Sequence, residues 1–96
     1  MKSLGEIIVD FRAEKALKSG NSLLPVGATK CIGQFSRGDV VTIKGQDGQI
    51  IAKGLASFNH TETEKILGLK SDDIARVLGY NRKPELMHRD NMAFFN

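Results

Sequence analysis

The pattern of apolar and polar positions is clearest between residues 33 and 54. Two β-branched runs, at 40–43 and 50–52, flank a loop that contains an Asp-Gly pair at 47–48. Val and Ile fit a pleated, half-buried surface, and an Asp-Gly pair supplies the positive φ angles of a tight hairpin. A second turn, at 36–39, precedes the first run. The pattern predicts turn, strand, hairpin loop and strand, as in small antiparallel barrels and sandwiches.

The first twenty residues predict a strand followed by a short helix. Apolar residues dominate 6–10, and Asp10 can cap a helix over 11–19 that Gly20 ends. The cations of this helix recur every third residue and cluster on the face opposite its alanines, at Arg12, Lys15 and Lys18. Such a cluster is an ordinary solvated helix face or, on a sharper interpretation, a phosphate-facing surface.

A loop bracketed by glycines and a proline follows at 20–27. It contains the pair Leu23-Leu24, which we expect to be buried at the mouth of the fold. Residues 29–32 predict another strand that leads into the hairpin. Within it, Cys31 is expected to serve as a small core residue.

The last third of the chain predicts two helices between extended segments. The second hairpin strand is expected to continue through 55–58. Asn59 and Thr61 each precede a glutamate by three residues, the capping-box pattern of a helix start. Ser71 is the expected N-cap of a second helix, whose buried stripe and stop are Ile74, Val77, Leu78 and Gly79. A final extended segment is expected at 85–94.

Length, charge and cysteine content limit the classes of protein. The 96 residues suit one domain with a single modest core. A net charge of +3 permits an anionic partner without requiring one. A lone cysteine cannot form an internal disulfide, which favours a reducing compartment. Because no secretory segment or long apolar span is present, we expect a cytoplasmic protein with no membrane partner.

The stretch from the first helix through the hairpin resembles the PUA domain family, named for pseudouridine synthases and archaeosine transglycosylases. The shared features are a small helix ending in Ser-Gly, the SLLP-x-G loop at 22–27, G-x-F-x-x-GD-x-V at 33–41 and IA-x-G at 51–54. The resemblance implies a compact β pseudobarrel with short helices, mainly β within the α+β class.

In the RNA-binding members of that family, the first helix, the loop after it and the last strand form the nucleic-acid surface. Carried over to this sequence, the resemblance implies a possible RNA-binding or interaction surface at Arg12, Lys15, Lys18, Ser22, Leu23, Leu24, Gly27, Lys30 and Arg89. Phe11, Phe94 and Phe95 are the nearby candidates for stacking on bases. The sequence departs from the family at Phe11-Arg12, where small residues are common.

The last third resembles, more specifically, the C-terminal PUA domain of glutamate 5-kinases. LGLKS at 67–71, LGY at 78–80 and HRDN at 88–91 have the spacing of that family, and the resemblance covers about residues 5–94. We therefore expect residues 1–96 to form a single PUA domain, with the catalytic amino-acid kinase domain absent. ATP and Mg2+ are implied only for that absent domain, and no cofactor is expected for this chain.

Two apparent catalytic signals lack the context that their chemistry requires. His-Arg-Asp at 88–90 matches a protein-kinase tripeptide, but the Gly-rich loop, the strand lysine and the DFG aspartate have no counterparts. We expect it to be a structural turn in which Asp90 and Asn91 bond backbone amides. The single Cys and the two His residues lie at no local zinc spacing. No catalytic or metal-binding residue is predicted, and the chain is not expected to be a complete enzyme.

Three functions remain open from the sequence. The first is an accessory or regulatory domain of a glutamate 5-kinase, an enzyme of proline biosynthesis that phosphorylates the side-chain carboxylate of L-glutamate with ATP. The kinase domain of the same polypeptide would then be its partner, with oligomers formed through the full-length enzyme. The alternatives are a stand-alone RNA-binding module and a protein-protein interaction module that docks through the Leu23-Leu24 loop.

Overall fold

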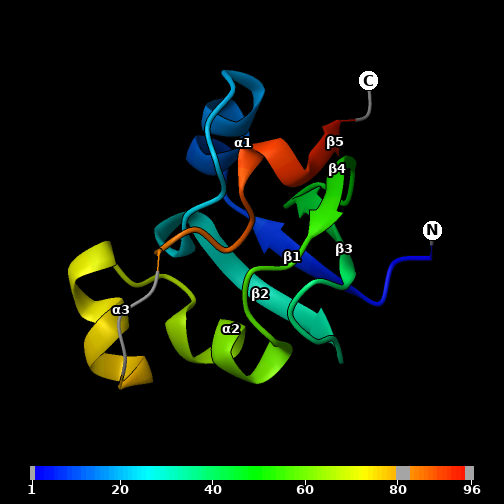
Figure 1. Cartoon of the computed structure of the whole chain (residues 1–96). Coiled ribbons are helices and arrows are strands. Elements are labelled where there is room, and N and C mark those ends of the chain that lie inside the picture. The colour runs from blue at the N-terminus through cyan, green and yellow to red at the C-terminus, as the bar shows by residue number, and fades with distance from the viewer. Residues whose placement is uncertain (1, 80–82, 95–96) are drawn as a thin grey trace.

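The computed structural model describes residues 2–79 and 83–94 (Figure 1). Over these residues the chain forms five strands and three short α-helices, which confirms the predicted α+β class. The strands are β1 (Gly5–Val9), β2 (Ala28–Gly33), β3 (Val40–Gly45), β4 (Ile50–Leu55) and β5 (Met92–Phe94). The helices are α1 (Phe11–Lys18), α2 (His60–Ile66) and α3 (Ser71–Leu78), with 3-10 turns η1 (Pro25–Gly27) and η2 (Arg89–Asn91).

The strands form one mixed sheet in the order β2-β1-β3-β4-β5. The predicted hairpin is β3 and β4, paired antiparallel with Ile43 opposite Ala52. β1 and β3 run parallel, with Ile7 opposite Ile43. The hairpin pattern favoured a purely antiparallel sheet, and this parallel pair differs from it. The chain between β1 and β3 forms α1 and β2, which is long enough for β3 to enter the sheet in the same direction as β1.

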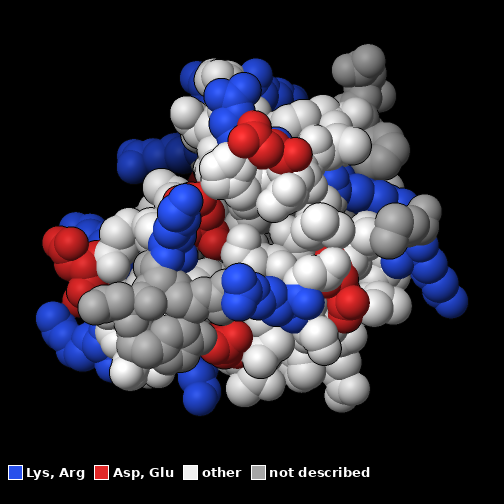
Figure 2. All heavy atoms as spheres, in the orientation of Figure 1, with Lys and Arg blue, Asp and Glu red and all other residues white. Residues whose placement is uncertain are grey.

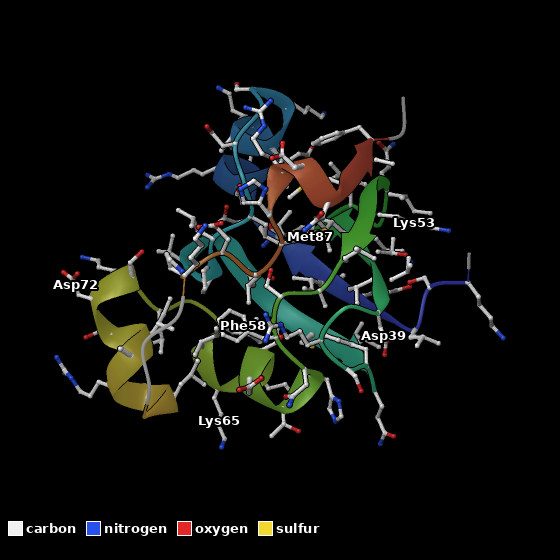
Figure 3. All side chains as sticks on the ribbon, in the orientation of Figure 1. Asp39, Lys53, Phe58, Lys65, Asp72 and Met87 are labelled. Carbon is white, nitrogen blue, oxygen red and sulfur yellow. The ribbon has the colours of Figure 1, made fainter. Side chains whose placement is uncertain are left out.

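The core lies on one face of this sheet, because alternate residues of a strand point to opposite sides. In β1, Ile7 and Val9 are buried while Ile8 between them is only partly covered. Side chains from outside the sheet close the core, and Figure 3 shows two of them, Phe58 above α2 and Met87 where the C-terminal segment crosses the middle of the molecule. α2 and α3 lie at the opposite end of the molecule from α1 (Figure 1).

The second hairpin strand ends earlier than predicted. β4 stops at Leu55, although Ala56 N–H still donates to the oxygen of Asp39, the residue before β3 (2.9 Å). The chain leaves the hairpin at Ser57, whose N–H donates to Leu86 O (3.0 Å). The predicted extended segment at 85–94 is likewise interrupted, by η2.

The predicted start of α3 is also wrong by one residue. Ser71 is the first helical residue, and the N-cap is Lys70, whose side chain makes no capping hydrogen bond. Of the predicted buried stripe, Ile74 is buried, whereas Val77 is 43% exposed. Gly79 ends the helix in the left-handed conformation, as predicted. No helix among the described residues combines the length and apolarity needed to cross a membrane.

Candidate nucleic-acid interface

Helix α1 is formed by local interactions that the sequence predicts. The Asp10 carboxylate caps it by accepting a hydrogen bond of 2.8 Å from Ala13 N–H. Leu17, with 1% exposure, anchors the inner face in the core. Gly20, at φ +95°, reverses the chain after the last turn. The helix therefore stands at a defined edge of the fold with its other face open.

The loop after α1 is tied to the C-terminal segment by a short antiparallel bridge. Leu23 N–H donates to Met87 O (3.0 Å), and Leu86 N–H donates to Leu23 O (2.8 Å). The predicted burial of the Leu-Leu pair is correct for Leu23, at 1% exposure, and wrong for Leu24, at 40%. Leu24 is extended, so its side chain points away from the side that Leu23 occupies.

The turn η2 packs beside α1, although the two are far apart in sequence (Figure 1). Arg89 N–H donates to Ser22 Oγ (3.0 Å), and the Arg89 guanidinium lies against Gly20. His88 caps the turn, since its Nδ1 accepts from Asp90 N–H at 3.1 Å. Within this turn the capping side chain is thus His88, rather than the predicted Asp90 or Asn91.

A cavity of about 650 Å3 lies between α1, the following loop and the C-terminal segment. Its lining includes the apolar side chains of Ala13, Ala16, Leu24 and Val26. Polar residues also line it, namely Asp10, Arg12, Asn21, Ser22, Glu85 and His88. This volume is in the usual range for small-molecule or cofactor sites.

Cations surround the outer side of α1. Arg12, Lys15, Lys18 and Arg89 are all exposed, and Figure 2 shows Lys and Arg side chains gathered over α1 and the adjoining turn, with an acidic group between them. Lys18 Nζ pairs with Glu14 Oε2 at 3.0 Å. Lys15 Nζ lies 5.6 Å from the ring centre of Phe11, which is 69% exposed. The helix thus presents an open aromatic ring among positive charges.

The structure brings together most of the residues predicted for the surface. Five of them line the cavity: Arg12, Ser22, Leu23, Leu24 and Gly27. Leu23 and Gly27 are buried, so they shape its inner wall and offer no exposed side chain. Lys15 and Lys18 lie outside the cavity on α1, and Arg89 is joined to it through Ser22.

Lys30 lies apart from the other predicted residues. It is on β2 opposite Ile8, on the sheet face that carries the 2.8 Å ion pair of Lys44 with Glu6. Of the predicted stacking aromatics, Phe94 is 45% exposed on β5, and Phe95 lies outside the described residues.

Sequence reasoning missed Asp10, Asn21, Glu85 and His88 as cavity residues. Glu85 and His88 reach α1 only through the bridge between Leu23 and Met87, which no local pattern signals. The one signal that could have indicated them was the family resemblance, because its RNA-binding members use the last strand as part of the nucleic-acid surface.

Cys31 and the two histidines do not form a site with one another. Cys31 packs against the core at β2 but is only partly buried, and burial first, then the charge of Glu64, raises its pKa to about 11. His60 is the first residue of α2, and its ring centre lies 6.0 Å from that of Phe35. Among the described residues, no three Cys, His, Asp or Glu side chains converge as a metal site would require.

The fold and the site together define the class of protein. It is a small mixed-sheet domain with a cavity and a cationic helix at one end. The PUA domain family matches residues 5–78 of the sequence. The chain belongs to the PUA domain family, as its motifs predicted.

The similarity extends to individual proteins. The chain is 48% identical over 91 residues to a glutamate 5-kinase of Aquifex aeolicus, covering 95% of this chain and 25% of that protein. It is 47% identical over 94 residues to a glutamate 5-kinase of Pseudomonas entomophila, covering 97% and 25%. These matches confirm the predicted resemblance. The chain spans about a quarter of the length of the relatives it matches, so most of each kinase has no counterpart in this chain.

Solved structures share the fold. A PUA domain of Aeropyrum pernix, solved as a tartrate complex, has a TM-score of 0.66 and 23% identity, covering 88% of this chain and 41% of that one. An H/ACA RNP bound to a substrate RNA has a TM-score of 0.61 and 25% identity, covering 91% and 25%. Both comparisons confirm the predicted fold class.

Proposed function

We propose that this chain is an accessory, regulatory PUA domain of a glutamate 5-kinase and acts in the cytoplasm with the kinase domain of the same polypeptide. The supporting observation is the 48% identity over 95% of the chain to one such kinase. The parent enzyme would phosphorylate the side-chain carboxylate of L-glutamate with ATP and Mg2+, the step that commits glutamate to proline synthesis. The domain itself would hold neither substrate.

A direct assay tests whether this domain lacks kinase activity of its own. The chain is incubated with ATP, Mg2+ and L-glutamate, and ADP release is followed. We expect no glutamate-dependent release, because the chain spans only about 25% of the length of the kinases it matches. Glutamate-dependent turnover by this chain alone would contradict the proposal.

We also propose that the α1 end of the domain binds single-stranded RNA. The observations that favour it are the exposed cations on α1 and η2, the open Phe11 ring and the cavity between them. Aromatic rings and guanidinium planes stack on unpaired bases, and cations contact phosphates. A structural relative, the H/ACA RNP, was solved with a substrate RNA.

The RNA proposal predicts a salt-dependent affinity. Binding of a labelled single-stranded RNA is measured by fluorescence anisotropy at several salt concentrations. Replacing Lys15 and Lys18, which lie on α1 outside the cavity, by Gln should make the negative slope of log K against log salt shallower by about 1.4, at roughly 0.7 per phosphate contact. Lys65→Gln is the control, since Lys65 is exposed on α2 at the other end of the molecule (Figure 3). Absence of binding even at low salt would refute the proposal.

A further inference from the structure

The cavity beside α1 has an acidic wall, and this wall is not explained by phosphate binding. Two carboxylates line the cavity: Asp10, whose Oδ1 already accepts from Ala13 N–H at the helix cap, and Glu85, whose side chain is 22% exposed. A carboxylate repels phosphates, so the RNA backbone would follow the cations outside the cavity rather than enter it. The chemical group suited to the cavity is therefore largely apolar and carries hydrogen-bond donors.

The hydrogen bonds within the C-terminal turn determine what this wall offers. His88 Nδ1 accepts from Asp90 N–H at 3.1 Å, so the neutral ring carries its proton on Nε2. His88 Nε2 and Glu85 Oε2 are 4.0 Å apart, too far for a hydrogen bond between them. The wall thus presents one donor beside one acceptor, and neither is used up by the other.

The remaining walls fit a flat ring. Ala13, Ala16, Leu24 and Val26 supply apolar surface, and the guanidinium of Arg12, which also lines the cavity, can stack on an aromatic plane. Arg12 has no ion pair or hydrogen bond from its side chain among the described residues. It is therefore available to the ligand.

We propose that this cavity receives one unstacked nucleobase that carries an exocyclic amino group, adenine or cytosine, from single-stranded RNA. The amino group donates to Glu85, and the adjacent ring nitrogen accepts from His88 Nε2–H. Glu85 is then the specificity-determining residue of the site, because a base without the amino group leaves its carboxylate unpaired. This inference rests on the RNA binding proposed above and adds to it the identity of the base.

The test removes the amino group without changing the shape of the base. Two uridine-rich octamers are compared, one with a single central adenosine and one with purine riboside, which is adenosine without its 6-amino group. We expect the adenosine RNA to bind about ten- to a hundredfold more tightly, the usual effect of one hydrogen bond to a charged group. The preference should fall with Glu85→Gln, which keeps a neutral acceptor, and disappear with Glu85→Met, which keeps the length and removes the acceptor.

A charge-matched control separates base reading from general electrostatics. Asp72→Asn removes one negative charge from α3, remote from α1 (Figure 3), and should leave the adenosine preference unchanged. Glu85 variants also remove a negative charge and can therefore strengthen binding of both RNAs. This general effect is the same for the two octamers, so the ratio of their affinities does not contain it. Equal affinity of the wild-type chain for the two octamers, with salt-dependent binding retained, overturns this inference and leaves RNA binding standing. No binding of either octamer overturns both.

Discussion

The guanidinium of Arg89 lies flat against Gly20, at the point where α1 ends. A Cβ placed on Gly20 would lie 3.4 Å from Nη2, 3.5 Å from Nη1 and 3.6 Å from Cζ of Arg89. The C-terminal carbonyls of a helix carry partial negative charge, so a cation at this end is favourable. One contact therefore joins the C-terminal turn to the first helix and completes the cationic end of the domain.

Replacement of Gly20 by Ala should lower the free energy of unfolding by about 1–2 kcal/mol, because a side chain at positive φ is strained. Gly20 has φ +95°, and the distances to Arg89 allow ordinary contact. Gly38→Ala is the matched control, with φ +89° and open space around it. Urea denaturation should give similar losses for both. A much larger loss at Gly20 would mean that the Arg89 guanidinium cannot accept a neighbouring methyl group.

Replacement of Gly54 by Ala should loosen the C-terminal strand. The new Cβ would overlap the Asn91 carbonyl oxygen and lie 2.5 Å from Met87 Sδ, at a φ that is not itself strained. Overpacking of this kind costs about 1–3 kcal/mol. Because Gly54 pairs with Met92, amide exchange in β5 should accelerate.

The control for this variant is Gly48→Ala, in the hairpin loop with φ +83° and no atoms near the new Cβ. It should lower stability through backbone strain without a selective change in exchange at β5. Unchanged β5 protection in Gly54→Ala would show that the C-terminal turn does not depend on the close approach.

The two helix starts in the second half of the chain should respond oppositely to substitution. Asn59 forms a capping box with Glu62, so Asn59→Ala should destabilise by about 1 kcal/mol.

Lys70 caps α3 without a side-chain hydrogen bond, and Lys70→Ser should stabilise by roughly 0.5–1 kcal/mol. Lys70→Ala is the neutral reference. Thermal unfolding measures all three, and destabilisation by Lys70→Ser would contradict the assigned cap.

Cys31 should react slowly with alkylating reagents in the folded protein. Burial, and secondarily Glu64, raises its pKa to about 11, and the thiolate is the reactive form. At pH 8 the thiolate fraction, and with it the rate with iodoacetamide, should be about 100-fold below that of a thiol of pKa 9. The rate should rise through pH 10, and urea should abolish the difference. A native rate equal to the unfolded rate at pH 8 would show that the thiol is not shielded.

Features determined by neighbouring residues were predictable from the sequence. The turn of the hairpin, the Asp10 and Asn59 caps and the glycine stops at Gly20 and Gly79 all depend on hydrogen bonds or φ angles within about one helical turn. The misplaced cap of α3 has the same origin, since Ser71 and Lys70 are adjacent and either could start the helix. The family was also predictable from the sequence, because the SLLP-x-G and HRDN segments occur in the order that is typical of it.

Tertiary structure alone decided which side chains meet at the candidate site. The parallel pairing of β1 with β3, the exposure of Leu24 and the bond from Arg89 to Ser22, 67 residues apart, follow from packing of apolar faces across the whole chain. A local pattern specifies how a segment folds, but the long-range partner depends on which surfaces are buried together. For that reason the sequence indicated a cationic first helix, and only the fold showed Glu85 facing the cavity beside it.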